Sequence, residues 1–542
     1  MRKYTTLLAA LLITAGAAAQ TTTNDSINRM VLVESTYNPI IAGAVKRNFI
    51  PEEVEPSMKK EAIVYANESM PINRFARTPR IAESASIAHT TNHPGYLHLG
   101  YGNYNNLDGL AAYSLRFKEN HALTMNAYIN GWNGKLKGYD NTRWRSSLYD
   151  MGLNADYRLL LGKAELNASI NGAYHNYNYL KSANFYGESD WQQSHRLGGK
   201  LGIKGTIKEH YQYHAAAEYT HFGRNAYFGN KQYHSQGHLH TEASFGIDLY
   251  EYGLASLLLR SDVLLHQGLD TYGDYLSIGI TPKWSYRYED LNFTAGANLD
   301  FQGNKYGPVV QASPDCKISY IPSKIFSADL ILNGGRNIHT FSSLYALSPY
   351  WASHSQLTSS YTFVNTFLQG NVRIIEGLHL HLGGGYRITD NVLFEQAFEE
   401  DELMYTGFTT QDAKVAYANA RIDYIYKDWV NVIAEGHYNH WMVEGNQAIL
   451  ARAPQLDAHL NTRVRIIPGL YAHTDCRLVM FNAVDGFRER TIIDWSLGAH
   501  YAMNDKLSFF LDGHNLLNRH YERYAGYPNQ GINGMLGAVF KF

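Results

Sequence analysis

The end of the chain alternates between apolar and polar side chains, and this pattern limits the fold more than any other feature. Residues 507–514 place mostly apolar side chains on one face of an extended chain and mostly polar ones on the other. After a polar return over residues 515–530, the final strand is apolar at every second position: Leu536, Ala538, Phe540 and Phe542. In a soluble protein such a strand would be an exposed edge, whereas in a closed membrane barrel it pairs with the first strand. The pattern therefore predicts a closed, all-β membrane barrel.

The same stretch resembles the C-terminal end of TonB-dependent outer-membrane receptors. Their pattern there has an Asn-Leu pair, a downstream Tyr, a Tyr-Pro dipeptide, a Gly and a terminal Phe, matched here by Asn515, Leu516, Tyr521, Tyr527, Pro528, Gly531 and Phe542. The resemblance implies a barrel in the cell outer membrane, with Phe540 and Phe542 as the barrel-insertion signal. Its implied partners are outer-membrane lipid and the barrel-assembly machinery. Members of that family also carry a plug domain before the barrel, and none is recognisable in this sequence.

A second resemblance lies between Leu347 and Asn365. TonB-dependent receptors often carry a segment of the type Asn-Pro-x-Leu-x-Pro-Glu in a mid-barrel loop, followed by a strand. Here Ser348 and Pro349 stand where Asn-Pro is usual, and the acidic residue is absent. The match supports a mid-barrel loop followed by a strand, and it identifies no ligand.

Residues 1–19 have the order of a secretory signal peptide. Arg2 and Lys3 precede an apolar run, and Ala17, Ala18 and Ala19 follow it. Beyond this segment no apolar run reaches the ~20 residues that a membrane helix needs. We therefore expect an exported chain that crosses a membrane with strands.

Residues 20–93 differ in composition from the rest of the chain, since prolines and clusters of charge mark them as an irregular periplasmic or lumenal segment. Within it, Val31, Leu32 and Val33 form a short β-prone run that could add to the edge of another sheet. One interpretation is a contact peptide for a TonB-type energiser, as the resemblance implies. The other is a strand fragment or a disordered tail.

Residues 94–542 are expected to form the barrel. Ten short polar turns divide this part into stretches of about 10 to 15 residues, the length of a tilted membrane strand. Ten hairpins and one further strand at each end predict an antiparallel up-and-down barrel of about 22 strands, closed by pairing of the first and last strands, with both termini periplasmic. The predicted turns are Glu119-Asn120, Leu161-Gly162, Lys208-Glu209, Tyr250-Glu251, Glu289-Asp290, Pro322-Ser323, Glu376-Gly377, Lys427-Asp428, Pro468-Gly469 and Asn504-Asp505. The longest outer returns are Asn178 to Trp191, Asn333 to Thr358, Thr389 to Gln411 and Trp441 to Pro454.

The hairpin over residues 456–478 shows which side chains should face lipid. Leu456, Leu460 and Val464 alternate with charged residues, and a charge facing hydrocarbon would cost about 2 to 4 kcal/mol near the midplane. The predicted lumen-facing residues are therefore Asp457, His459, Arg463, Arg465, His473, Asp475 and Arg477.

Composition agrees with a membrane barrel and argues against several other classes. The 42 Tyr and 8 Trp fit aromatic girdles at two membrane interfaces. A net charge of −2 gives no basic surface for nucleic acid. Cys316 and Cys476 lie far apart without metal-ligand spacing, so we expect two isolated thiols.

Histidine clusters are the main candidates for chemistry. His379 and His381 share a strand face and could hold a metal, but two imidazoles without a third ligand do not complete a zinc site. His238 with His240, and His437 near His440, raise the same question. Because no GxSxG, HExxH or phosphate-binding glycine loop occurs, we expect no enzyme, no cofactor and no metal.

The resemblance and the pattern together predict solute passage or ligand capture across the outer membrane. Since a wide barrel without a plug would leave an aqueous hole, inward-folded loops are the expected obstruction. The alternative is a surface scaffold that transports nothing and whose loops bind a lipoprotein or another partner.

Overall fold

The computed structural model describes residues 93–118, 120–137, 143–181, 191–208, 210–225, 233–268, 272–304, 307–352, 356–357, 359–400, 403–484 and 491–542. The predicted signal segment and the predicted contact residues Val31, Leu32 and Val33 lie outside these residues, as does nearly all of the segment 20–93. No helix in the described part of the chain has the length and apolarity needed to cross a membrane.

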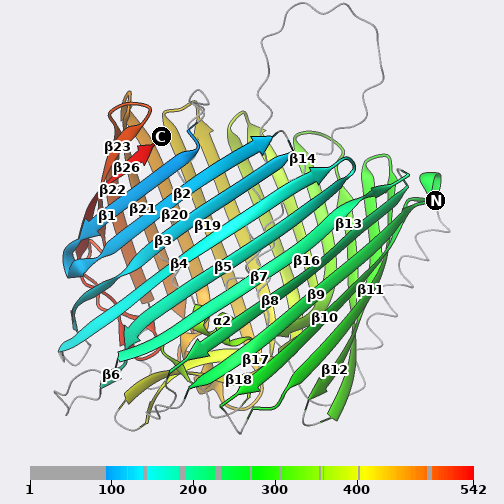
Figure 1. The fold of residues 1–542 in the computed structure, drawn as a ribbon, viewed down its shortest axis with the longest axis horizontal. Coiled ribbons are helices and arrows are strands. Elements are labelled where there is room, and N and C mark those ends of the chain that lie inside the picture. Colours follow the sequence, from blue (N-terminus) through cyan, green and yellow to red (C-terminus); the bar gives the residue numbers. More distant parts are fainter. Residues whose placement is uncertain are drawn as a thin grey trace, which may run out of the picture.

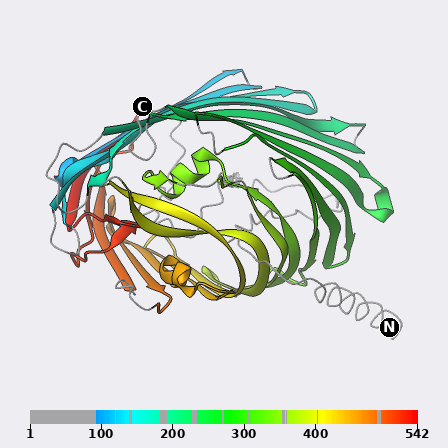
Figure 2. The ribbon, with the colours of Figure 1, turned by 90° about the horizontal axis from the view of Figure 1, so that it is seen from below.

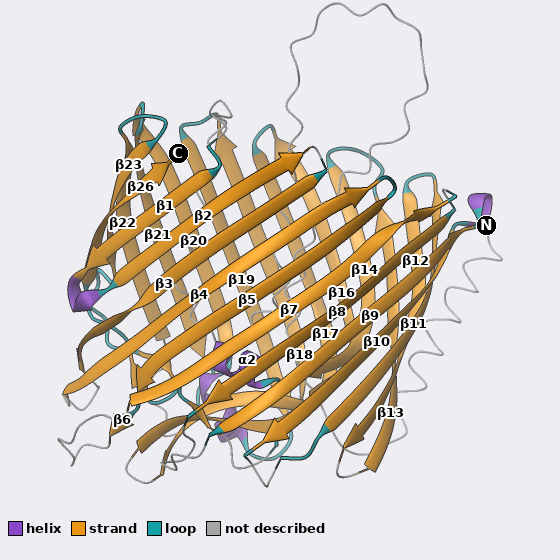
Figure 3. Cartoon of the chain, viewed as in Figure 1, coloured by secondary structure: helices purple, strands orange, loops and turns teal. Residues whose placement is uncertain are grey.

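The described residues form one closed antiparallel barrel of 22 strands (Figures 1 and 3). The first and last strands pair from Tyr96 opposite Lys541 to Gly102 opposite Met535. The predicted barrel class, strand number and closure are therefore confirmed. The wall strands are β1 (Gly95–Gly102), β2 (Leu107–Lys118), β3 (His121–Lys137), β4 (Arg143–Leu161), β5 (Ala164–Asn178), β7 (Trp191–Ile207), β8 (Tyr211–Arg224), β9 (His234–Asp248), β10 (Leu254–Gln267), β11 (Tyr275–Tyr288), β12 (Leu291–Asn304), β13 (Gly307–Tyr320), β14 (Phe326–Ile338), β16 (Ser359–Ile375), β17 (Leu378–Glu400), β18 (Leu403–Tyr426), β19 (Val430–Val443), β20 (Pro454–Ile467), β21 (Leu470–Phe481), β22 (Thr491–Ala502), β23 (Leu507–His514) and β26 (Asn533–Lys541).

All ten predicted turns fall at the junctions of consecutive wall strands. At three of them glycine takes the left-handed conformation that it adopts without strain: Gly162 with φ +61°, Gly377 with φ +82° and Gly469 with φ +82°. These short turns lie at one end of the barrel, together with the C-terminus (Figure 1). The other end carries the longer returns, and we refer to its opening as the mouth.

Alternating exposure follows the predicted faces of the strands. In β20, Leu460, Val464 and Ile466 are exposed, whereas the charged residues between them are partly buried. The last strand shows the same contrast, since Leu536 is 63% exposed and Val539 only 2%. Cys316 in β13 and Cys476 in β21 are free thiols, as expected.

Short elements occupy the returns between wall strands. Three 3-10 helices and one α-helix are present in the described residues: η2 (Asn103–Asn105), η3 (Tyr250–Tyr252), η4 (Gln447–Arg452) and α2 (Phe341–Leu347). The short strands β6 (Leu180–Lys181) and β15 (Trp351–Ala352) join the main sheet, and β24 (Glu522–Tyr524) pairs with β25 (Tyr527–Pro528).

The predicted outer return Thr389 to Gln411 is wrong, because β17 and β18 continue as a paired hairpin through most of it. A bulge between Thr389 and Val392 bends the ladder, and pairing then resumes from Val392 to Glu400. Val392 and Phe394 are buried against Trp441, and this packing explains why the segment is ordered strand.

Candidate functional site

Three segments fold into the mouth of the barrel. The inner segment (residues 339–352) connects β14 to β16 and contains α2 and β15. The lid hairpin (residues 389–400 and 403–411) is the outer part of β17 and β18, and the terminal loop (residues 515–532) contains β24 and β25. Seen from the mouth, α2 lies inside the ring of strands and the lid hairpin passes across that ring (Figure 2).

The inner segment is tied to the wall through α2. The Thr340 hydroxyl caps the helix by accepting a hydrogen bond from the Ser343 amide at 3.0 Å. The Phe341 amide donates to the side-chain oxygen of Gln236 on β9 at 2.8 Å. On β4, Asp150 accepts a hydrogen bond from the Tyr345 hydroxyl at 2.7 Å. Both ends of a two-turn helix are therefore held by polar residues of the barrel interior.

Arg224, at the end of β8, anchors the next part of the inner segment. Its guanidinium is 1% exposed and lies 4.9 Å from the centre of a Trp351 ring. It donates to the Trp351 carbonyl oxygen at 2.9 Å and also to the Tyr179 hydroxyl. Because a buried charge is costly without partners, these contacts fix the position of β15 relative to the wall.

The lid hairpin pairs with segments that come from distant parts of the chain. β15 runs parallel to Thr406 and Gly407 of the lid, and the Thr406 amide donates to the Tyr350 carbonyl oxygen at 3.0 Å. The Ser348 and Thr406 hydroxyls lie 3.0 Å apart. β6 pairs with Leu403 and Met404 on the same strand. The hairpin is therefore held across the mouth by backbone pairing as well as by side chains.

The terminal loop closes against both of the other segments. Tyr527 stacks on Tyr350 with ring centres 3.6 Å apart and planes at 5°, and its hydroxyl donates to the Met404 carbonyl oxygen. The Ala525 amide donates to a Glu395 carboxylate oxygen at 2.6 Å. Arg452, which is 5% exposed, lies 3.1 Å from Glu522 and 3.9 Å from Glu395. The buried Glu395 of the lid hairpin thereby has its partners inside the protein.

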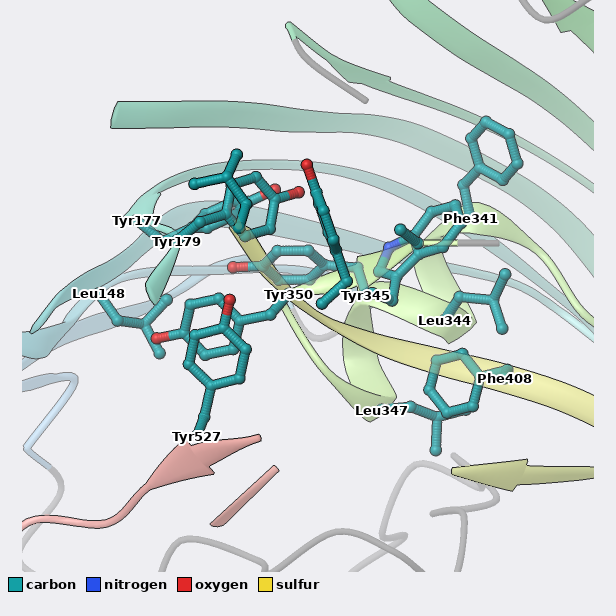
Figure 4. Close-up of a cluster of buried hydrophobic side chains, with 14 of the residues drawn as sticks. Leu148, Tyr177, Tyr179, Phe341, Leu344, Tyr345, Leu347, Tyr350, Phe408 and Tyr527 are labelled. Carbon is teal, nitrogen blue, oxygen red and sulfur yellow. The ribbon is translucent and has the colours of Figure 1, made fainter. Parts of the chain in front are cut away.

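These contacts enclose an apolar, aromatic-rich core at the mouth, which we term the mouth cluster (Figure 4). Burial raises the pKa of the phenols of Tyr345, Tyr350 and Tyr527 above the ordinary tyrosine value, so these groups remain protonated. Its buried members are Trp132, Leu136, Trp144, Leu148, Tyr177, Tyr179, Phe222, Tyr272, Phe341, Leu344, Tyr345, Leu347, Tyr350, Trp351, Ala352, Leu357, Leu403, Tyr405, Phe408 and Tyr527.

A polar chamber adjoins the mouth cluster on the wall formed by β2 to β9. It consists of two cavities of about 420 and 520 Å³, which share Asp156 and Ser169 in their linings. The first cavity also touches Thr340 and Ser342 of the inner segment. The remaining charged or imidazole residues of the linings are Arg116, Arg158, Arg196, Lys200, His214, Glu218 and His238. Such a mixed polar lining suits a hydrated, polar solute.

The seven residues predicted to face the lumen contact one another and their neighbours in pairs. Asp457 lies 2.6 Å from Arg477, and His459 lies 2.5 Å from Asp475. Residues directly opposite each other on neighbouring strands share a face. The strand register can be followed from β21 through β22, β23, β26, β1, β2 and β3 to β4. It places Arg477 on the same face of the wall as Asp150, which the inner segment contacts.

The other predicted lumen residues also have defined contacts. The Arg463 guanidinium lies 4.1 Å from the centre of the Tyr471 ring, Arg465 pairs with Asp428, and His473 lies 3.1 Å from Asp512. These residues are on β20 and β21, whereas the chamber is lined from β2 to β9. The location of the chamber was not predicted from the sequence.

His379 and His381 do not converge on a common point with a third ligand. The His381 ring lies 2.6 Å from Asn371 through Nδ1 and 3.2 Å from Asp423 through Nε2. The predicted insertion residues Phe540 and Phe542 stack on each other with ring centres 5.6 Å apart, and both are exposed.

The mouth cluster was missed because its tyrosines were assigned to membrane girdles. The signal for it was present in the two stretches that carry the family resemblance, since Tyr350 belongs to one and Tyr527 to the other. In the structure these two rings stack directly.

No protein-family model matches this chain, and no curated protein sequence matches it. Solved structures do match, each over 83% of the chain. The FrpB iron transporter from Neisseria meningitidis aligns with a TM-score of 0.66, 11% identity and 81% of its own length. A mutant ferric enterobactin receptor PfeA from Pseudomonas aeruginosa gives 0.61, 10% and 80%, and a copper transporter, OprC, gives 0.63, 9% and 80%. At these identities the likeness shows the fold.

Proposed function

We propose, from the barrel fold that this chain shares with TonB-dependent outer-membrane receptors, that it passes or captures a polar solute across the outer membrane. In this proposal the short turns and both termini face the periplasm, and the mouth faces the outside. The mechanism is physical, without bond breaking: the mouth opens, the polar chamber receives the solute, and the mouth closes again.

The observation that carries the proposal is that three segments fold into the mouth and meet beside a polar chamber. The inner segment, the lid hairpin and the terminal loop meet at Tyr350, Thr406 and Tyr527. A solute arriving from the outside has to displace these segments. Opening has to break the hydrogen bonds and aromatic contacts between them, each worth about 0.5 to 1.5 kcal/mol net, and to expose part of the buried mouth cluster.

The way in which opening is driven is a separate part of the proposal. If Val31, Leu32 and Val33 form a contact peptide for a TonB-type energiser, removing residues 29–34 abolishes uptake and leaves the barrel intact. Uptake that is unchanged by this deletion would exclude the contact-peptide role.

Single-channel recording in planar bilayers tests the closed mouth. Purified full-length protein should show a low baseline conductance with brief openings. The double variant Y350A/Y527A removes the stacked pair and should raise the open fraction. A large, steady conductance from the unaltered protein would contradict the proposal.

A surface scaffold that transports nothing is the alternative function. The segments that fold into the mouth also favour this function, because a permanent anchor of this width must not leak. Deletion of residues 392–408 separates the two functions. If the lid hairpin controls solute passage, its removal should raise the permeability of the barrel. Lost lipoprotein binding with unchanged solute permeability would favour the scaffold.

A further inference from the structure

Two histidines and an aspartate converge on the inner face of the barrel, beside the polar chamber. His238 and His240 are two residues apart on β9 and therefore share a face. Asp262 lies directly opposite His240 on β10. One carboxylate oxygen of Asp262 is 2.9 Å from His238 Nε2 and 2.7 Å from His240 Nδ1.

We propose that His238, His240 and Asp262 bind a divalent transition-metal ion of the zinc type. Their three ligand atoms lie within 4.8 Å of one another, and they form the one such group of three found among the described residues. Two imidazoles and a carboxylate are ligands that suit Zn²⁺, with ligand distances of about 2.0 to 2.2 Å. An ion between the three atoms therefore requires only small side-chain movements.

Access and a fourth ligand come from the polar chamber. His238 and Glu218 both line the cavity of about 420 Å³. Glu218 lies directly opposite His240 on β8, on the side away from Asp262. A carboxylate oxygen of Glu218 or a water molecule in the cavity can complete a tetrahedral set. The proposal does not depend on solute passage, because it requires only that ions reach the chamber.

Another histidine on the wall, His459, shows that contacts with carboxylates do not by themselves form a metal site. His459 uses Nε2 toward Asp475 at 2.5 Å and Nδ1 toward Glu435 at 3.6 Å. Its ring thus bridges two carboxylates that lie on opposite sides, and the three groups do not converge. His459 and His381 are therefore matched controls, because each has an acidic neighbour but does not belong to a converging group of three.

Zinc titration of the full-length protein tests the site. Protein stripped with EDTA is titrated calorimetrically with ZnCl₂ at pH 7.5. We expect binding whose affinity falls at least about tenfold in H240A and in D262N, and is unchanged in H381A and H459A. The D262N side chain keeps an acceptor oxygen, so a loss there reports the lost charge rather than a collapsed wall. MgCl₂ should not compete, because Mg²⁺ prefers an all-oxygen octahedral set.

The position of the ion provides the second measurement. Crystals soaked in ZnCl₂ should give an anomalous peak at the zinc edge between His238, His240 and Asp262. An anomalous peak found only at other histidines would overturn the proposal. Identical zinc isotherms for the unaltered protein and H238A/H240A would overturn it as well.

Discussion

Tyr527 contributes both a ring and a hydroxyl to the mouth cluster, and these two contributions can be separated. Its ring stacks on Tyr350, and its hydroxyl lies between the Met404 carbonyl oxygen and the Leu180 amide. Y527F keeps the ring and should cost about 1 to 3 kcal/mol of local stability, because buried polar partners lose their hydrogen bond. Y527A loses the ring too and should cost about 3 to 5 kcal/mol. Hydrogen exchange of residues 403–408 measures both changes.

The matching control for Tyr527 is Tyr471, whose ring lies under Arg463 on the wall. Y471F should leave exchange of residues 403–408 unchanged. If Y527A and Y471F gave the same exchange, the terminal loop would not hold the lid hairpin.

Arg224 offers a second test at the scale of one side chain. Its planar guanidinium serves the Trp351 carbonyl oxygen and the Tyr179 hydroxyl at once, and a lysine ammonium cannot reproduce that fork. R224K should therefore loosen the inner segment by about 1.5 to 3 kcal/mol, measured as faster exchange of residues 348–352. R463K on the wall is the control and should not affect those residues. Unchanged exchange in R224K would mean that the lid hairpin alone positions β15.

At the scale of elements, the strands were predictable and the inward segments were not. Each turn, such as Leu161-Gly162, is marked by residues within a few positions of it, so a local pattern suffices. The segment of the lid hairpin was predicted as an outer return, whereas its strands are paired and it carries the buried Glu395. Glu395 is satisfied by the Ala525 amide, which lies 130 residues away in the chain. Periodicity carries no information on such a partner.

The last strand supports a prediction of its own. Phe540 and Phe542 are exposed at the end of β26, where the backbone of Phe542 pairs with Gly95 in both directions at 2.8 and 3.0 Å. If both rings form an insertion signal, F540A/F542A should lower the folded barrel in the membrane several-fold without changing the fold of molecules that do insert. Heat-modifiable gel migration of the membrane fraction measures this yield.

The control for the last strand is F509A. Phe509 is exposed on the neighbouring strand β23 to the same 41% as Phe540, but it is not terminal. Equal yields of F509A and F540A/F542A would indicate that apolar surface, rather than a terminal signal, determines insertion.

Considered as a whole, the molecule is a rigid wall surrounding segments that could change position. The wall is held by continuous ladders between neighbouring strands, whereas the mouth is held by contacts between residues far apart in the chain, such as Tyr345 with Asp150 across 195 positions. A single sequence reveals the first kind of contact through its periodicity and the second hardly at all. This difference also suggests which part moves, because a ladder opens only by breaking many hydrogen bonds together.

A disulfide across the mouth tests whether that part moves. The Ser348 and Thr406 hydroxyls lie 3.0 Å apart and are fully buried, so S348C/T406C should form a bridge between the inner segment and the lid hairpin. Oxidation should slow hydrogen exchange of residues 403–408 and abolish brief openings in bilayers, and reduction should restore both. The matched control is S285C/T294C, since those hydroxyls lie 3.1 Å apart on the adjacent strands β11 and β12, which are already paired. The control bridge should change neither measurement. If residues 403–408 exchanged equally slowly in the oxidised and the reduced S348C/T406C variant, the mouth would not open. Solute passage controlled by the lid hairpin would then be excluded.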